Sequence, residues 1–487
     1  MACHKERSPL IHQAILGQDA HSLGRTFRLL GISAVAALGG FLFGFDSGVI
    51  NGTIDALRDA FGSDDIGTGM NVASMLLGCA VGAFFAGTWA DTLGRRPVLL
   101  AAAVAFIVSA WGSGIARGSL EFVVYRLLGG MAVGAASVLS PAYIAEIAPA
   151  RFRGRLVALQ QLAIVLGLFF AFLSNYVLAA LAGGAAEGLW GGFSGWRWMF
   201  WMEIGPAVGF LLGLCLIPES PRYLVAAGQV GQAERVLASL TDSRTAAIQI
   251  EAIRETVLHD RKPRMADVLD PATGRLHPIV WVGIGLAVLV QFTGINVVFY
   301  YGAVLWQAAG FTEADALLTN VIGGCVNVGC TLVAMTLVDR VGRRPLLLAG
   351  ALGQAVTLGV MAAVFSQSDR SPEGALEMTG TGGIVALVAA NAYIACFACT
   401  WGAVYWVLVG EMFPNRFRGA ALSLAGMTCW LATFVITITF PAMLDRLGLG
   451  VSYGIYAAFG VVAYWFVYHM VRETRGRTLE EISMDRD

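Results

Sequence analysis

A single acidic residue, Asp46, lies inside a run of apolar residues near the start of the chain, in Phe-Leu-Phe-Gly-Phe-Asp-Ser-Gly-Val at 41–49. A carboxylate within a membrane is costly unless it is protonated or paired. Burial disfavours the charged form and a nearby guanidinium favours it, so a carboxylate beside Arg126 could exchange a proton when its partner moves. These residues point to proton exchange. The alternatives are a solvated carboxylate at the outer mouth of the protein, or a static pair with Arg126.

Side chains that both donate and accept hydrogen bonds recur in other apolar runs. Gln291 and Asn296 are five residues apart, which is about 140° around a helix axis. Both can border one cavity only if the helix is broken, and Gly294 between them would permit a break. Amides suit a ligand that is a ring of hydroxyls, although they also serve as hydrogen-bonding glue between membrane helices, as Trp serves as an interface anchor. The same set includes Gln160, Gln161, Asn327, Trp406 and Trp430.

Two charged motifs each occur twice, in the same order. Asp-Thr-Leu-Gly-Arg-Arg-Pro at 91–97 returns 248 residues later as Asp-Arg-Val-Gly-Arg-Arg-Pro at 339–345. Glu-Ile-Ala-Pro-Ala-Arg-Phe-Arg-Gly at 146–154 returns 265 residues later as Glu-Met-Phe-Pro-Asn-Arg-Phe-Arg-Gly at 411–419. Two matches at nearly one spacing indicate that the chain consists of two copies of one half.

The elements that carry these residues are expected to be membrane-spanning helices. The chain is 57% hydrophobic and 13% charged, whereas soluble proteins carry about 25% charged residues. Twelve apolar runs reach the length that a bilayer requires, so we predict an all-α membrane protein with twelve transmembrane helices in two six-helix bundles. The runs fall near 29–50, 67–90, 97–116, 119–142, 156–182, 197–217, 278–308, 315–338, 344–365, 381–410, 418–440 and 449–471.

The basic residues predict the orientation of the chain. Most Arg residues between the runs lie in alternate loops, on the side of both tails, which places both termini in the cytoplasm, and short loops fit a bacterial inner membrane. The polar stretch in the middle is expected to be a cytoplasmic helical linker, with amphipathic helices at 231–237 and 246–259. The predicted regions are an N-terminal tail (1–27), a first bundle (28–217), the linker (218–276), a second bundle (277–471) and a C-terminal tail (472–487).

Several classes of function find no support. The chain has no Gly-x-x-x-x-Gly-Lys-Ser/Thr or His-Glu-x-x-His motif, so neither ATP-driven transport nor an enzyme is predicted. Cys396 and Cys399 form a Cys-x-x-Cys without a second pair, which favours small buried side chains over a metal or redox site. A net charge of −1 gives no basis for nucleic-acid binding. We expect no metal and no cofactor.

In the order of its motifs the chain resembles the major facilitator superfamily and, within it, the sugar porter family. The resemblance covers about residues 31–481. It is strongest to bacterial proton–pentose or proton–hexose symporters and next strongest to animal glucose facilitators. Besides the two repeats, it rests on Tyr-Arg-Leu-Leu-Gly-Gly-Met at 125–131, Pro-Ala-Tyr-Ile-Ala-Glu at 141–146, Pro-Glu-Ser-Pro-Arg at 218–222, Gln-Phe-Thr-Gly-Ile-Asn at 291–296 and Arg-Glu-Thr-Arg-Gly-Arg-Thr-Leu-Glu at 472–480.

The resemblance implies a secondary active transporter that imports a monosaccharide with a proton by alternating access, as a monomer in the lipid bilayer. The proton would be the coupling ion, carried by Asp46 with Arg126, since proton-coupled members have Asp at this position. Glu203 matches an acidic position of the symporters and is either a second coupling residue or a packing residue. A uniporter, in which Asp46 is structural, and a membrane sugar sensor remain alternatives. Xylose, glucose, galactose and inositol all remain open as substrates.

The resemblance also implies the positions that contact the sugar. Two departures from the family alter this pocket: Val290 stands where a Gln is frequent, and Cys429 stands where facilitators often have Asn. Each removes a hydrogen-bonding group. The implied contacts are Gln161, Gln291, Asn296, Asn327, Trp406 and Trp430, with Phe43 and Gly402 as wall residues.

Charged residues at helix ends complete the predicted site. By the same resemblance they form ion pairs between helices and between the halves, and these pairs close a cytoplasmic gate. The alternative is that some of the Arg residues only anchor helices at the cytoplasmic face. The residues are Asp91, Arg95, Arg96, Glu146, Arg153, Glu219, Arg222, Asp339, Arg343, Arg344, Glu411, Arg418 and Glu473.

Overall fold

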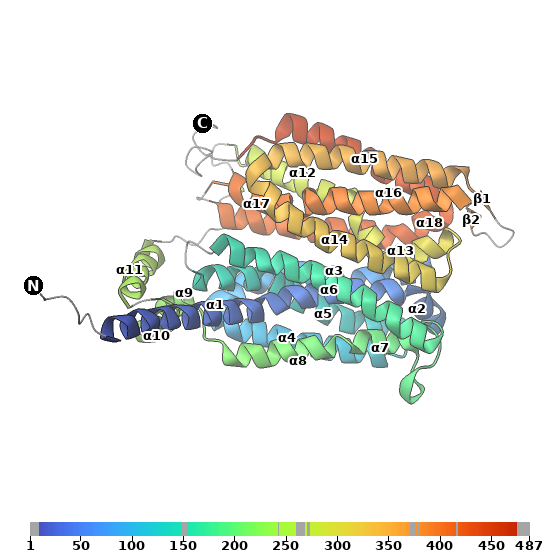
Figure 1. Ribbon diagram of the computed structural model, residues 1–487. Helices are drawn as coiled ribbons and strands as arrows, with labels where there is room; N and C mark the ends of the chain where they lie inside the picture. Colours follow the sequence, from blue (N-terminus) through green and yellow to red (C-terminus); the bar gives the residue numbers. More distant parts are fainter. Residues whose placement is uncertain are drawn as a thin grey trace, which may run out of the picture.

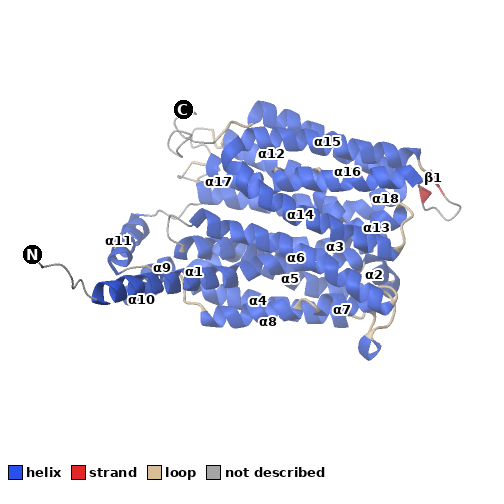
Figure 2. Ribbon diagram, viewed as in Figure 1, coloured by secondary structure: helices blue, strands red, loops and turns tan. Residues whose placement is uncertain are grey.

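The fold consists of two helical bundles that lie side by side (Figure 1). The computed structural model describes residues 9–148, 153–241, 243–259, 268–269, 273–370, 376–377, 380–414 and 417–474. The described residues form helices apart from loops and one short β-hairpin, β1 (Asp369–Arg370) with β2 (Leu376–Glu377) (Figure 2).

The first bundle contains six spanning segments. Long, mainly apolar runs give long helices here because only helices satisfy their own backbone groups in lipid. A 3-10 turn, η1 (Ile50–Gly52), and a short helix, α2 (Ile54–Phe61), follow the first segment, and a second 3-10 turn, η2 (Trp190–Gly192), precedes the sixth. The segments are α1 (Pro9–Val49), α3 (Asp65–Leu93), α4 (Arg95–Ile115), α5 (Ser119–Ile147), α6 (Arg153–Ala182) and the pair α7 (Gly195–Trp201) and α8 (Ile204–Leu216).

The second bundle repeats this arrangement. Its last two predicted runs form one continuous helical assignment, α18 (Arg418–Met470), which turns at Gly448 with φ of 76°. The other segments are the pair α12 (Pro278–Phe292) and α13 (Ile295–Ala308), then α14 (Glu313–Val341), α15 (Arg343–Gln367) and the pair α16 (Gly380–Cys399) and α17 (Trp401–Met412). Because α18 holds two runs, the eleven membrane-crossing helical segments among the described residues correspond to the twelve predicted runs, and the predicted fold is confirmed.

Three spanning segments are broken. The segment from 278 to 308 breaks at Gly294, the residue that the sequence shows would permit a break, and its φ of 87° is left-handed and favours glycine. The segment from 195 to 216 breaks between Trp201 and Ile204, because Pro206 has no N–H to bond the carbonyl of Met202 and its ring would clash there. The third break is at Thr400, which has φ of −130° and ψ of −90°.

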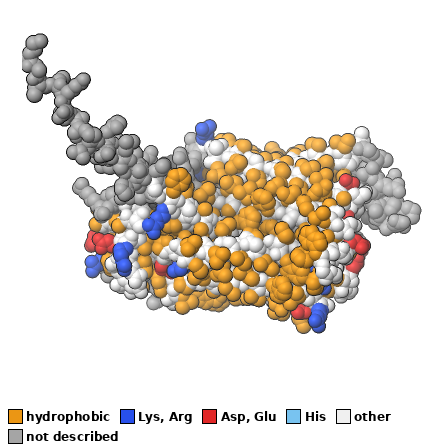
Figure 3. All heavy atoms as spheres, turned by 60° about the horizontal axis from the view of Figure 1, so that its bottom comes forward, with side chains coloured by type: hydrophobic (Ala, Val, Ile, Leu, Met, Phe, Trp, Pro, Cys, Tyr) orange, Lys and Arg blue, Asp and Glu red, His pale blue; other side chains and the backbone are white. Residues whose placement is uncertain are grey.

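The described part of the chain begins and ends at one end of the molecule, with α9 (Pro221–Ala226), α10 (Val230–Leu240) and α11 (Ser243–His259) (Figure 1). We call this the tail end, and the opposite end, with α2 and the β1–β2 hairpin, the hairpin end. Helices thus form at both stretches of the linker that the sequence pattern singles out. On the face seen in Figure 3, hydrophobic side chains cover the middle and charged ones gather toward the two ends, as a bilayer requires.

Candidate functional site

A cavity of about 140 Å³ lies between the two bundles. The first bundle contributes side chains of α1 and α6 to its walls, and the second contributes those of α13, α14, α16 and α17. Most of the lining is apolar or aromatic, and a few amides and hydroxyls supply polar contacts. Such a cavity suits a small ligand with apolar faces and polar edges. Five predicted residues line it: Phe43, Gln161, Asn296, Asn327 and Gly402.

The break at Gly294 joins the two amides that flank it. Asn296 donates a short hydrogen bond from Nδ2 to Oε1 of Gln291. Gln291 in turn donates from Nε2 to Sγ of Cys429, at 2.9 Å. Gln291 therefore lies one layer behind Asn296, which lines the cavity. Cys429 stands at the position where facilitators of the family often have Asn, and its thiol accepts this hydrogen bond from Gln291.

The two predicted Trp residues differ in their surroundings. Trp430 is buried, and its ring lies 5.5 Å from that of Phe43, centroid to centroid, across the boundary between the bundles. Trp406 is 48% exposed and packs on Tyr405. Neither lines the cavity in this conformation, so their contact with a ligand stays a prediction.

The carboxylate of Asp46 is buried and paired. Arg126 donates from Nη1 to Oδ1 of Asp46 in a short contact and from Nη2 to the Asp46 carbonyl oxygen at 3.3 Å. Both side chains are 1% exposed, and the guanidinium carbon lies 5.6 Å from the centroid of the Phe200 ring. The structure therefore excludes a solvated position for Asp46 in this conformation.

Glu203 completes a buried cluster. It lies at the break before α8 and is 2% exposed. Its Oε1 and the Oδ2 of Asp46 accept no hydrogen bond from the part of the protein that the structure describes. Two carboxylates with one guanidinium between α1, α5 and the start of α8 can hold a proton as well as a cation. Ser47, the residue after Asp46, lines the cavity, so the cluster and the cavity share a wall.

Sequence analysis did not single out Asn51, which joins the bundles at the hairpin end. Its Nδ2 donates to the Phe299 carbonyl at 2.7 Å, and its Oδ1 accepts from Ala303 N at 3.2 Å and from Asn320 Nδ2 at 2.8 Å. The side chain is buried. These bonds hold η1 against α13 and α14 of the other half. An amide at the end of an apolar run is the signal in the sequence, but nothing there identifies its partners.

Two carboxylates reinforce this closure. Gln307 of α13 donates to Oδ2 of Asp55 in α2 at 2.8 Å. The backbone N–H of Ala185, in the first half, donates to Oε1 of Glu313 in α14 at 2.9 Å. Within the described part of the chain, the hydrogen bonds that join the two halves lie at the hairpin end, which is therefore closed.

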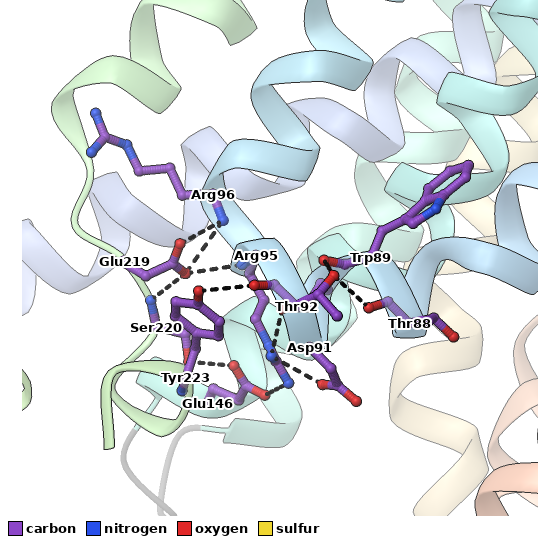
Figure 4. A network of polar contacts seen from close by, with 11 residues as sticks. Thr88, Trp89, Asp91, Thr92, Arg95, Arg96, Glu146, Glu219, Ser220 and Tyr223 are labelled. Carbon is purple, nitrogen blue, oxygen red and sulfur yellow. Dashed lines mark hydrogen bonds and ion pairs between the residues drawn. The ribbon is translucent and has the colours of Figure 1, made fainter. Parts of the chain in front are cut away.

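At the tail end, charged residues of the first half form one network (Figure 4). Arg95 pairs with Asp91 at 3.2 Å and with Glu146 at 3.1 Å. The carboxylate of Glu219 accepts from the backbone N–H groups of Arg95 and Arg96, at 3.1 to 3.3 Å. It thereby caps the N-terminus of α4, where the unpaired N–H groups and the helix dipole favour an anion.

The second half repeats the network. Arg343 pairs with Glu411 at 2.8 Å, and the backbone N–H groups of Arg343 and Arg344 donate to Glu473 at 3.0 Å. Thr474 donates to Glu411 at 2.7 Å, as Ser220 donates to Glu146 in the first half. The repeated motifs of the sequence therefore make corresponding contacts in the two halves.

Ion pairs between helices are present at this end, and those among the described residues join helices of the same half. Pairs between the halves stay a prediction for a conformation in which the tail end is closed. The side chains of Arg153 and Asp339 lie outside the described residues. Arg222 is on α9 and Arg418 begins α18.

Burial raises the pKa of Glu219 even though the N–H groups of Ser220, Arg96 and Arg95 lower it. A neutral side chain that accepts hydrogen bonds should therefore be tolerated there. We expect Glu219→Ala to lower the free energy of unfolding by about 1–3 kcal/mol, because three N–H groups lose their acceptor, and Glu219→Gln to have a smaller effect. Thermal unfolding of the purified protein measures both. Glu473→Ala and Glu473→Gln repeat the test in the other half, and equal losses for Ala and Gln would contradict it.

Comparisons with known proteins agree with this geometry. A family model described as "Sugar (and other) transporter" matches residues 32–485. The glucose transport protein of Synechocystis sp. is 51% identical over 454 residues, 93% of this chain and 96% of that protein. The D-xylose-proton symporter of Escherichia coli is 37% identical over 490 residues, 93% of this chain and 95% of that protein.

A solved structure shows the same fold. The xylose transporter XylE from E. coli, in an inward open conformation, aligns with a TM-score of 0.80 at 36% identity, and the alignment covers 94% of this chain and all of that one.

Proposed function

Because the chain belongs to the sugar transporter family of the major facilitator superfamily, we propose that it imports a monosaccharide together with a proton by alternating access. Such a protein is a transporter and not an enzyme. The observation that carries the proposal is the buried Asp46–Arg126 pair, which lies directly behind a cavity formed by both bundles.

The cavity is the proposed sugar site. Asn296, Asn327 and Gln161 can donate to and accept from hydroxyl groups, and Phe43 and Phe299 offer faces for C–H groups. The amides come from both halves, so a bound sugar would join them. A ligand that contacts both halves favours the closed intermediate through which alternating access passes.

The proton site would work through the position of Arg126. In this conformation Arg126 pairs with Asp46, which favours the ionised carboxylate. Movement of Arg126 toward Glu203 would leave Asp46 buried without a partner, and a proton would then bind. The membrane potential contributes about 2.3 kcal/mol per charge per 100 mV to such a step.

The conformation fits an inward-facing state. The hairpin end is closed by bonds between the halves, and the tail end carries the excess of Arg in its loops, so we assign the tail end to the cytoplasm. The likeness to the inward open xylose transporter supports the same assignment. Both termini would then be cytoplasmic.

Sugar-induced alkalinisation tests the proposal. Xylose, glucose, galactose and myo-inositol are added in turn to an unbuffered suspension of de-energised cells that make the protein. The names of the relatives suggest glucose and xylose first. An alkaline shift with one sugar supports proton symport of that sugar. Entry of a sugar without a shift supports the alternative, a uniporter in which Asp46 is structural, and absence of entry overturns the substrate class.

Asn296→Ala should weaken sugar binding by ten-fold or more. The change removes a hydrogen-bonding group from the cavity wall and releases Gln291, and each lost bond contributes about 1 kcal/mol or more. Titration of the purified protein, followed by tryptophan fluorescence or calorimetry, gives the Kd. Asn391→Ala is the matched control, because Asn391 donates to Leu387 of its own helix and does not line the cavity. Equal Kd values for the two variants would contradict this role for Asn296.

A further inference from the structure

Three cysteines meet where α14 packs against the end of α16. Cys399, the last residue of α16, donates from Sγ to the carbonyl oxygen of Cys330 in α14 at 3.5 Å. Cys396 precedes Cys399 by three residues, which is about one turn of α16. All three are free cysteines and partly exposed. The Cys-x-x-Cys of the sequence thus finds a third thiol on a neighbouring helix, which the sequence alone does not indicate.

The cluster lies at a hinge beside the cavity. Cys399 immediately precedes Thr400, where the spanning segment breaks between α16 and α17. Thr331 and Ala398, the neighbours in sequence of Cys330 and Cys399, line the cavity. A bond between Cys330 and Cys399 would therefore fasten α14 to the hinge, and the angle between α16 and α17 could no longer change freely.

The chemistry of the cluster favours a ligand that needs two thiols. Among the described residues no set of three or more His, Cys, Asp or Glu side chains could hold a metal ion. Sulfur is a soft ligand and selects soft partners. We propose that Cys330 and Cys399 form a dithiol site for trivalent arsenicals, and that a ligand bridging them arrests the hinge of α16 and α17.

The reaction with phenylarsine oxide requires no change of oxidation state. Two As–S bonds replace the bonds of arsenic to oxygen, the two thiol protons leave with that oxygen as one water molecule, and arsenic stays trivalent. The arsenic atom and the two sulfur atoms then belong to one ring that closes through the protein. A reagent with one thiol competes poorly with such a ring, whereas 2,3-dimercaptopropanol removes the arsenic because its two thiols form a ring with it.

The test uses the full-length protein in liposomes and phenylarsine oxide as the probe. Intact mass spectrometry should show one phenylarsenic group per chain, with the loss of two thiol hydrogens. Glucose or xylose counterflow should fall at least ten-fold and return after 2,3-dimercaptopropanol. Cys330→Ser and Cys399→Ser should each retain counterflow. Neither variant should carry the phenylarsenic group (the adduct), and the arsenical should no longer inhibit their counterflow. Cys325→Ser is the matched control, because Cys325 is exposed on the same helix α14, and it should stay sensitive.

The readouts separate this inference from the proposed sugar transport, on which only the counterflow measurement rests. An adduct that persists in Cys330→Ser and Cys399→Ser overturns the site. An adduct that is lost in these variants, with wild-type counterflow unaffected by the arsenical, overturns the arrest of the hinge. Absence of counterflow before any reagent is added would count against the proposed function alone, since the adduct still reports the site.

Discussion

Replacing Asp46 by Asn should abolish uphill sugar uptake while sugar exchange continues. Asn fills the same space and can still accept a hydrogen bond from Arg126, but it cannot take up and release a proton. At a potential of 100 mV one coupled charge supports about 2.3 kcal/mol, or roughly fifty-fold accumulation. The variant should therefore show an internal-to-external sugar ratio near one. Uptake of labelled sugar into energised vesicles, with counterflow in de-energised ones, measures both properties.

Asp59→Asn is the matched control for this variant. It removes a carboxylate of the same size from α2, where the side chain is exposed, and it should leave accumulation unchanged. Accumulation that survives in Asp46→Asn would contradict coupling through Asp46. Loss of exchange together with accumulation would assign Asp46 a structural role, because breaking a buried ion pair is strongly destabilising.

Glu203 distinguishes two versions of the proton site. If protons bind to Asp46 alone, Glu203→Gln should accumulate sugar normally. If the proton is shared within the cluster of Asp46, Arg126 and Glu203, accumulation should fall while exchange persists. Glu203 lies buried at a helix break and interacts electrostatically with Asp46 of α1 and Arg126 of α5. This placement gives the second version its physical basis.

Local patterns in the sequence predict much of this fold. The twelve runs, the repeat and the break at Gly294 all follow from hydropathy, spacing and the conformational freedom of glycine. The pairing of Asp46 with Arg126 also follows, because a charge in an apolar run needs a partner. Pro206 carried a signal for the break before Ile204. The sequence carries no such signal for the break at Thr400, since neither Gly nor Pro stands at the break itself.

Contacts that depend on the conformation could not be predicted in this way. The bonds of Asn51 exist only when the hairpin end is closed, and the ion pairs found among the described residues of the tail end join helices within each half. A sequence encodes both conformations of a transporter, so its motifs do not tell which one a structure adopts. For the same reason, the sequence could not indicate that Trp406 lies outside the cavity in this conformation.

Asn51→Ala should open the hairpin end. The side chain makes three hydrogen bonds across the boundary between the halves, each worth about 1 kcal/mol. Their loss, about 3 kcal/mol in total, would shift the equilibrium between closed and open hairpin ends by roughly a hundred-fold. Spin labels on Asp59 and Ala314, exposed residues of opposite halves at this end, report the change as a longer distance between the labels.

Asn175→Ala separates this effect from simple loss of a buried amide. Asn175 is also buried and donates to the Val49 carbonyl at 3.0 Å, but both residues belong to the first half. Its replacement should lower thermal stability without lengthening the distance between the labels. If Asn51→Ala and Asn175→Ala give the same distance distribution, the closure of the hairpin end must depend on packing of apolar side chains. The bonds of Asn51 would then follow closure rather than cause it.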